Sequence, residues 1–290
     1  PIHKLSNEIV IKIIEKMDPK DRKALARMDN RMYALEQMAG HRQFDWVEIE
    51  AENGCVCYMS RSASGLKHES YEYTPSIKNA AFFKHATTPE LRILGSIDSN
   101  TDEIILNAIK SLTFKVLDIQ VTNEFSYRLL CQLIRLFKYT DELIIYWKIE
   151  SLEESRRMFL NLPSMINYRK IYFGTAIAKA RFLDDEVFAD ILNKSSGEVT
   201  FHCCRNSITA RGLDVAFHSV YSSERKGKIV CNPTVRESKA YCREMFHSDD
   251  FERNISDTTI EFKHVESGAT FSYERNRWNR VEMAPASTAL

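Results

Sequence analysis

The sequence predicts a two-part chain of the α+β class, in which a short helical part is followed by a longer α/β part. Apolar residues recur at helical spacing through residues 1–45, and strand-like runs alternate with helix-like runs through residues 76–290. Near the end of the chain, two alternating runs flank a turn sequence, which predicts a C-terminal β-hairpin. Short alternating runs through residues 46–75 predict a small antiparallel β meander that links the two parts.

The composition argues against several classes of protein. The 290 residues include 40 Lys plus Arg and 40 Asp plus Glu, so the formal net charge is zero. Proteins that neutralise phosphates usually carry a basic excess, so no nucleic-acid partner is expected. No run approaches the roughly 20 apolar residues of a membrane helix, so no membrane partner is expected.

The seven cysteines have no framework spacing, and the first apolar run is interrupted by Lys12. We therefore expect no signal peptide, and a cytoplasmic and/or nuclear location.

The first part is expected to form three short helices. One apolar stripe on the first helix is formed by Ile9, Ile13, Ile14 and Met17. Ser6 or Asn7 can cap the first amide groups of this helix. A second helix is expected over residues 19–27, and the apolar spacing after Met28 predicts a third. Helices this short bury their apolar faces poorly by themselves, so this part needs a partner protein or a neighbouring domain.

The residues of this first part resemble an F-box. The matching segments are Leu5-Ser6-Asn7-Glu8-Ile9, Ile13-Ile14, Asp18-Pro19-Lys20-Asp21 and Asn30-Arg31-Met32-Tyr33, with Met17, Leu25 and Met28 at apolar positions. They follow the family pattern of Leu-Pro-x-Glu-Ile/Leu, Ile-Leu, Leu-Asp-Pro-x-Asp and a Lys/Arg-x-Trp ending. In three places the sequence departs from that pattern, because Ser6 replaces Pro, Arg22 replaces Leu and Tyr33 replaces Trp. The resemblance covers about residues 3–45.

The resemblance implies a role in ubiquitin conjugation. An F-box docks onto the Skp-type adaptor of an SCF ubiquitin ligase, and through the adaptor onto the cullin. The residues that the resemblance assigns to adaptor binding are Leu5, Ser6, Glu8, Ile9, Ile13, Met17, Pro19, Leu25 and Met28. The alternative interpretation is an ordinary helical subdomain that packs on its own chain. Exposure of the Ile9 and Ile13 side chains distinguishes the two, because the alternative requires residues 42–290 to cover them.

The second part alternates strands with single helices, which predicts a parallel sheet. The strand-like runs are residues 115–121, 143–149, 170–173, 198–202 and 228–231. The helix-like runs are residues 102–112, 124–137, 152–160, 184–192 and 209–222. Good N-cap residues stand at the starts of three of these helices, namely Thr122-Asn123, Ser151 and Asp184.

A regular spacing narrows the prediction to a solenoid of stacked units. Two apolar residues with one position between them recur as Leu117/Ile119, Leu143/Ile145, Ile171/Phe173, Val199/Phe201, Ile229/Cys231 and Ile260/Phe262. The steps between successive pairs are 26, 28, 28, 30 and 31 residues. A nearly constant period of this size is similar to a leucine-rich-repeat horseshoe in architecture, although the asparagine ladder of that family is absent. A doubly wound open sheet is the alternative.

The last segment predicts a hairpin that caps the array. Residues 258–265 and 269–275 flank Glu266-Ser267-Gly268, which is a strong hairpin signal. Such a hairpin would cover the last open edge of the sheet, and residues 284–290 would form a frayed tail. An F-box followed by a degenerate repeat region resembles the nematode F-box proteins with an F-box-associated FTH-type domain. That resemblance implies that the second part recognises an unknown protein substrate.

The strand pattern also predicts a target-binding surface. If the apolar pairs point inward, period-two alternation places their neighbours on the opposite face of the sheet. The residues assigned to target binding on this basis are Asp118, Gln120, Tyr146, Lys148, Tyr172, Thr200 and His202. Tyr146 and Tyr172 would be exposed aromatic residues, which suit a protein interface. In the alternative interpretation, neighbouring loops or the β meander cover them.

No pattern predicts catalysis, a cofactor or a metal site. The motifs GxGxxG, GxSxG and HExxH and the P-loop are absent. Cys55 with Cys57, and Cys203 with Cys204, lack the second ligand pair of a zinc knuckle, so packed thiols are expected. A basic-aromatic group near the end is formed by Arg275, Arg277, Trp278 and Arg280, and a solvated strand face explains it better than RNA contact.

The sequence therefore predicts a substrate receptor that is not an enzyme. The first alternative is a leucine-rich-repeat-like interaction scaffold with no ubiquitin ligase role. The second is a hydrolase or metal enzyme, which would require Cys, His and carboxylate side chains to converge in one pocket.

Overall fold

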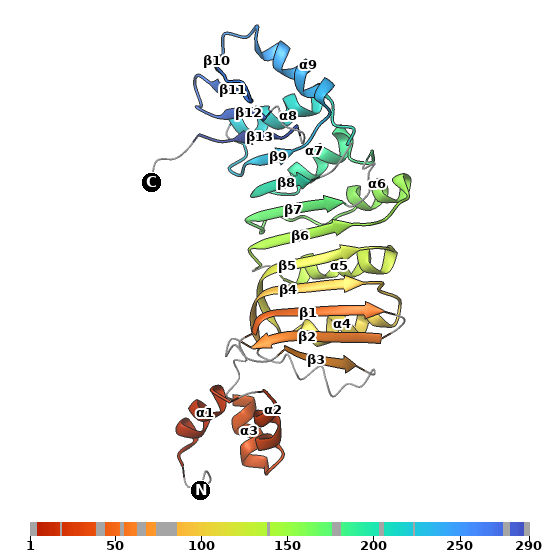
Figure 1. Ribbon diagram of the computed structural model, residues 1–290, viewed down its shortest axis with the longest axis vertical. Coiled ribbons are helices and arrows are strands. Elements are labelled where there is room, and N and C mark those ends of the chain that lie inside the picture. Colours follow the sequence, from red (N-terminus) through yellow and green to blue (C-terminus); the bar gives the residue numbers. More distant parts are fainter. Residues whose placement is uncertain are drawn as a thin grey trace. The chain divides into compact units, whose positions relative to one another are not determined.

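The protein, seen in a computed structural model, is an α/β chain with an open sheet (Figure 1). The structure describes residues 5–17, 19–38, 44–52, 55–62, 68–73, 86–137, 140–175, 181–202, 206–222, 224–274 and 279–286. The chain divides into two compact units, Pro1–Lys115 and Val116–Leu290. Strand β5 (Thr113–Val121) begins in the first unit and is described with the second.

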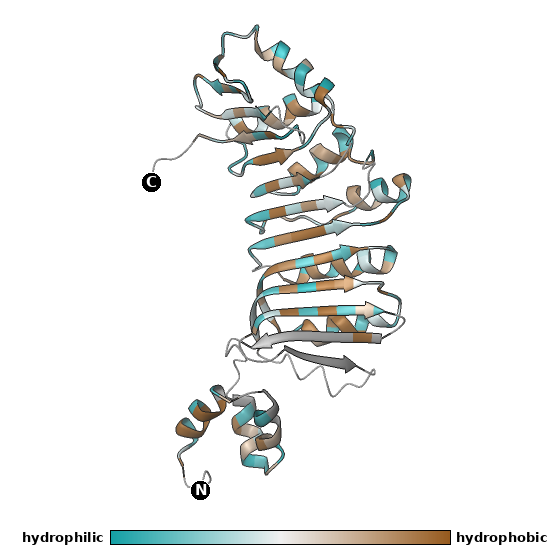
Figure 2. Cartoon of the chain, in the orientation of Figure 1, coloured by the Kyte–Doolittle hydropathy of each residue, from teal (hydrophilic) through white to brown (hydrophobic). Residues whose placement is uncertain are grey.

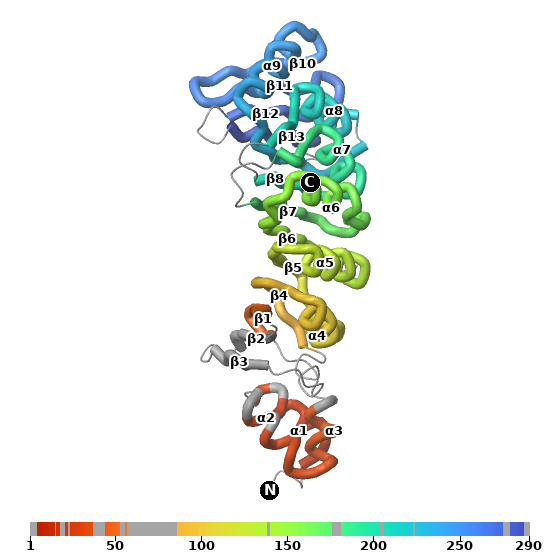
Figure 3. The backbone as a smooth tube through the Cα atoms, turned by 90° about the vertical axis from the view of Figure 1, so that its right-hand side faces the viewer, coloured from red at the N-terminus to blue at the C-terminus, as the bar shows by residue number. Residues whose placement is uncertain are grey.

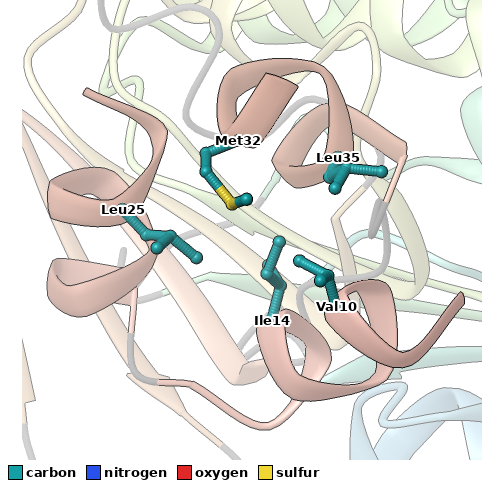
Figure 4. Close-up of a cluster of buried hydrophobic side chains, with 5 residues drawn as sticks. All are labelled: Val10, Ile14, Leu25, Met32 and Leu35. Atoms are coloured by element: carbon teal, nitrogen blue, oxygen red, sulfur yellow. The ribbon is translucent and has the colours of Figure 1, made fainter. Parts of the chain in front are cut away.

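Three short helices begin the first unit, as the sequence predicted. They are α1 (Asn7–Glu15), α2 (Pro19–Ala26) and α3 (Asn30–Met38). Their core is small and apolar, and Figure 4 shows its five side chains between the three helices: Val10, Ile14, Leu25, Met32 and Leu35. Ile11 and Met17 are partly buried and pack against this core.

The apolar residues of α1 lie on two faces of the helix. Ile14 belongs to the core and Met17 packs against it, whereas Ile9 and Ile13 are exposed. The predicted stripe of four residues is therefore buried along one edge and exposed along the other. Each residue advances about 100° around an α-helix, so Val10 and Ile14 can face inward while Ile9 and Ile13 face another direction.

A buried ion pair joins α2 to α3. Arg22 Nε lies 3.7 Å from Glu36 Oε1, and the two side chains are only 3% and 6% exposed. The start of α3 is held by Asp29, whose Oδ1 accepts a hydrogen bond from the backbone N–H of Met32 at 2.8 Å. Because a buried charge is tolerated when it is paired, the carboxylate of Glu36 helps Arg22 to occupy this interior position.

The other described residues of the first unit form four strands of the sheet and one helix. The predicted meander is confirmed, because β1 (Phe44–Glu52) pairs antiparallel with β2 (Cys55–Ser62), and β2 with β3 (His68–Tyr73). The sequence did not predict β4 (Thr87–Gly95), which runs parallel to β1 and precedes α4 (Thr101–Ile109). Pro89 weakens the strand signal of β4, but the pairing with β1 begins only at Leu91.

The alternation of strands and helices in the second unit is confirmed. Its parallel strands are β5, β6 (Glu142–Trp147), β7 (Lys170–Thr175), β8 (Glu198–His202) and β9 (Ile229–Cys231). Its helices are α5 (Glu124–Leu136), α6 (Leu152–Leu160), α7 (Asp185–Asn193), α8 (Ala210–Tyr221) and α9 (Val235–Met245). The last of these helices was not predicted.

The predicted N-caps begin three of these helices. The side chain of Asn123 accepts a hydrogen bond from the Ser126 backbone N–H and forms a capping box at the start of α5. The Ser151 side chain accepts from the Glu154 backbone N–H at the start of α6, and the Asp184 side chain accepts from the Val187 backbone N–H at the start of α7. Such a cap contributes about 1 kcal/mol, so these positions help to set where each helix starts.

The apolar pairs of the parallel strands are in register. Leu117, Leu143, Ile171, Val199 and Ile229 are direct neighbours from strand to strand. Ile119, Ile145, Phe173 and Phe201 form the next row. All of these side chains are buried, on the face that the helices cover. In Figure 3, α5 and α6 lie to one side of β5, β6 and β7.

The strand order within this unit bears on the choice between the two predicted architectures, a solenoid and a doubly wound open sheet. Strands β5 to β9 are neighbours in sequence order. A doubly wound sheet would reverse its order at a switch point and carry helices on both faces. Each of β6, β7 and β8 begins with a hydrophilic residue, and in β7 and β8 apolar residues then alternate with more polar ones, as the colours in Figure 2 show.

Four antiparallel strands complete the second unit. They are β10 (Phe251–Ile255), β11 (Thr259–His264), β12 (Thr270–Glu274) and β13 (Val281–Ala284). The predicted hairpin is confirmed as β11 and β12, and Gly268 has the positive φ of 70° that its turn requires.

The predicted position of this hairpin is wrong in one respect. The neighbour of β9 is β13, the last strand, rather than the hairpin itself. The sixth apolar pair, Ile260/Phe262, therefore lies on β11 and outside the parallel rows. Ala284, which was expected in a frayed tail, belongs to β13, whereas residues 287–290 lie outside the described residues.

Candidate protein-binding surfaces

The first candidate surface is the outer stripe of α1, which consists of Leu5, Ile9 and Ile13. These side chains are 36%, 49% and 37% exposed, although all three are apolar. Ile9 and Ile13 are spaced four apart and lie on one line along the helix face, and Leu5 precedes the helix. Ser6 and Glu8, also assigned to adaptor binding, are exposed beside them.

The other residues assigned to adaptor binding occupy different environments. Met28, between α2 and α3, is 60% exposed, and Tyr33 on α3 is 58% exposed. Leu25 lies in the core of the three helices, where its side chain stabilises the fold, and its assignment to adaptor contact stays a prediction. Met17 is only partly buried. The side chain of Pro19 lies outside the described residues.

Arg31 fixes the start of α1. Its Nη2 donates hydrogen bonds to the carbonyl oxygen of Leu5 at 2.7 Å and to Oδ1 of Asn7 at 2.9 Å. Its Nε donates to the same Asn7 oxygen at 3.2 Å. Sequence reasoning matched Arg31 to the family motif without giving it a role. The contacts show that it ties α3 to the beginning of the outer stripe.

The second candidate surface is the open face of the parallel sheet, opposite the face that the helices cover. Two rows of residues cross it in register. The first row is Asp118, Ile144, Tyr172 and Thr200, and the second is Gln120, Tyr146, Gly174 and His202. These residues are half-buried or exposed, apart from Gly174, which is buried. The structure thus brings the residues assigned to target binding together on one face, while target binding itself stays a prediction.

Three rings form an aromatic patch on this face, namely Tyr146, Tyr172 and His202. The ring centroids of the two tyrosines are 6.0 Å apart. The imidazole of His202 stacks on Tyr172 at 6.2 Å, with an angle of 21° between the ring planes. Tyr146 is 38% exposed. The patch therefore presents aromatic surface to a partner at low cost in conformational entropy.

Gly174 makes the arrangement of the patch possible. A Cβ atom at this position would lie 2.9 Å from Tyr146 Cδ1 and 2.9 Å from Tyr172 Cε1. Both tyrosine rings therefore pack over the backbone of Gly174, in space that any other residue would fill. Sequence reasoning missed this position, because a single Gly at the end of a strand gives no indication of which rings surround it.

We expect Gly174→Ala to displace the two tyrosine rings and to destabilise the second unit by about 1–3 kcal/mol, since overpacking forces neighbours from their preferred positions. Urea unfolding would measure the stability, and the ring-proton chemical shifts of Tyr146 and Tyr172 would report the displacement. Unchanged ring shifts would contradict this role of Gly174.

Charged residues at the strand starts neutralise one another on the same face. Lys170 Nζ lies 3.3 Å from a carboxylate oxygen of Glu142. Lys228 Nζ lies 3.8 Å from Glu198 and 3.6 Å from Glu282. Lys148 differs from these lysines, because its ammonium donates to the amide oxygen of Gln120 at 3.0 Å and forms no ion pair with the described carboxylates.

A cavity of about 310 Å³ lies between α7 and α8, and its lining includes Ile166, Leu192, Val215 and Arg225. Arg225 is buried and donates hydrogen bonds to the carbonyl oxygens of Leu192 at 2.9 Å and Ser195 at 2.8 Å. Burial lowers the pKa of its guanidinium to about 10. These bonds satisfy carbonyl groups at the end of α7, so the arginine has a structural role.

Neither a metal site nor a membrane-spanning helix is found among the residues that the structure describes. Among them, no group of three or more His, Cys, Asp or Glu side chains is placed to hold a metal ion. No helix in the described part of the chain is long and apolar enough to cross a membrane. Cys203, Cys204 and the side chains of Cys55 and Cys57 lie outside the described residues, as do Arg275, Arg277 and Trp278. Arg280 forms ion pairs with Glu282 and Glu274.

Comparison with known proteins does not assign the chain to a family. No protein-family model matches it, and no curated protein has a sequence that matches it.

Proposed function

We propose that this chain is the substrate-recognition subunit of an SCF-type cullin–RING E3 ubiquitin ligase. Its three N-terminal helices would form an F-box module that binds a Skp-type adaptor and, through it, the cullin. The observation that supports this most is the division of α1 into two apolar faces. Val10 and Ile14 already supply the core of the module, so the exposed Ile9 and Ile13 have no role within it. An exposed apolar stripe of this kind suits a protein partner.

We also propose that the second unit is a leucine-rich-repeat-like solenoid that holds the protein target. Sequential parallel strands, in-register apolar rows and a nearly constant period all support stacked repeat units. Its open face, with the aromatic patch, would be the target-binding surface. A cytoplasmic and/or nuclear location follows from this role.

The proposed mechanism is proximity rather than chemistry by this chain. With one end bound to the adaptor and the other to the target, the chain would raise the effective concentration of the target near the conjugating enzyme. No side chain of the chain needs to act as an acid, base or nucleophile in this role, so we propose that the chain is not an enzyme and requires no cofactor.

The test is co-purification of the full chain with a Skp-type adaptor. We expect the wild type to form a one-to-one complex, and Ile9→Asp with Ile13→Asp to weaken it by at least about 100-fold, because two charges would be buried at the interface. Both side chains are exposed, so the free variant should remain folded.

A matched control is Leu152→Asp with Val215→Asp, which also replaces two exposed aliphatic residues, but in the second unit. This control should retain the adaptor. If the folded wild type binds no adaptor, the ubiquitin ligase role is wrong. The chain is then better explained as an interaction scaffold with the same fold.

A further inference from the structure

We infer that the open face of the second unit binds an acidic segment of a protein, with the aromatic patch and Lys148 as the contact site. This inference deepens the proposed function, and it depends on that function only for the statement that the segment belongs to a ubiquitination target. It is supported by the donors and the charges of this part of the face.

Hydrogen-bond donors dominate the contact site. The phenol groups of Tyr146 and Tyr172, the imidazole of His202 and the ammonium of Lys148 can all donate. The row Gln120, Tyr146, Gly174 and His202 contains no carboxylate side chain. A ligand rich in acceptors, such as a carboxylate, complements such a surface best.

The charges of the face point to the same ligand. Lys170 and Lys228, at the starts of their strands, are each neutralised by glutamate. Lys148 extends from the other end of β6, where the neutral amide of Gln120 accepts its hydrogen bond. A partner carboxylate would thus meet a cation that no described carboxylate already neutralises, which is electrostatic complementarity of the kind that selects partners.

The same distribution disfavours nucleic acid, the other ligand that aromatic rings on a sheet can attract. Asp118 lies on this face in the same row as Tyr172, Glu142 and Glu198 lie in the row before it, and all three carboxylates would repel phosphates. An acidic protein segment needs contacts with a smaller part of the face than a nucleic acid does. One carboxylate at Lys148 and apolar contacts over the rings are sufficient. An exposed Tyr146 beside a half-buried Tyr172, with charged residues at the edge of the face, also matches the usual anatomy of a protein interface.

The experiment is an NMR titration of the full chain, without adaptor, using two capped peptides as probes. One peptide alternates Glu and Leu, and the other alternates Gln and Leu at the same length. We expect the acidic peptide to shift the backbone amide signals of Tyr146, Gly174 and His202, and the shifts to weaken at high salt. The Gln peptide should bind more weakly by about threefold or more.

Three variants test the assignment. Lys148→Met should weaken binding of the acidic peptide about threefold, and Lys148→Glu about tenfold. Lys239→Glu is the matched control, since it makes the same charge change at an exposed position on α9, and it should leave binding unchanged. Equal losses in Lys148→Glu and Lys239→Glu would overturn the inference, because they would reveal a net-charge effect.

Other outcomes would also overturn it. These are equal binding of the two peptides, shifts confined to residues away from the patch, and stronger shifts at the same amides with single-stranded polyuridine. Because the adaptor is absent, the result is independent of the proposed ligase role. Peptide binding without adaptor binding would identify a scaffold that recognises acidic segments, whereas adaptor binding without peptide binding would overturn this inference alone.

Discussion

Glu36→Ala is expected to destabilise the three N-terminal helices by about 3–5 kcal/mol, because it removes the Glu36 carboxylate from the buried Arg22. The two side chains are almost fully buried, so water cannot replace the lost partner. The core beside them contains few residues, and a loss of this size is comparable to the whole stability of a small module. The helices of this variant should therefore be largely unfolded.

Native-state hydrogen exchange of the Val10, Ile14 and Met32 amides would measure this effect. The informative control is Arg22→Met with Glu36→Leu, which removes both charges and keeps the interior apolar. Replacement of buried ion pairs in this way is neutral or stabilising by about 1–4 kcal/mol. The double variant should keep slow exchange and, if the proposed function is correct, bind the adaptor. Unchanged exchange in Glu36→Ala would show that the pair contributes little.

Trp147→Ala is expected to destabilise the second unit by about 3–5 kcal/mol, because it removes the largest side chain of the parallel core. Trp147 is 1% exposed, and its ring centroid lies 4.4 Å from that of Phe159 and 6.3 Å from that of Phe182. Its Nε1 donates a hydrogen bond to Ser155 Oγ at 2.8 Å, which ties β6 to α6. The cavity left by alanine has rigid walls on several sides and cannot collapse fully.

The free energy of unfolding in urea would measure this loss. Trp147→Phe separates packing from hydrogen bonding, since it keeps most of the apolar volume but removes the N–H. Ser155 Oγ still donates to the carbonyl oxygen of Ile149, so the loss of its acceptor role should cost only about 0.5–1.5 kcal/mol beyond the change in volume. If the alanine and phenylalanine variants lost the same stability, the packing explanation would fail.

The candidate surfaces were predicted from the sequence to different extents. Period-two alternation was sufficient to place Tyr146, Tyr172 and His202 on one face, because side-chain direction in a strand is a local property. It gave no indication that Gly174 accommodates two tyrosine rings, or that Lys148 contacts Gln120. Those relations depend on the register between strands, which residues far apart in the chain decide.

Interactions between residues that are close in the sequence explain most of what the sequence determined by itself. The periods of helices and strands, and the N-caps at Asn123, Ser151 and Asp184, depend on residues a few positions apart in the chain. The regular spacing of the apolar pairs can also be seen directly in the sequence. Together these patterns were sufficient to predict most elements and the parallel ladder. Non-local contacts decided the rest. The sequence of α1 is apolar on two faces, and only packing against α2 and α3 selected Val10 and Ile14 as the inner pair. In the same way, only the tertiary structure placed β4 beside β1 and β13 beside β9, because the sequence of a strand does not specify which other strand it pairs with.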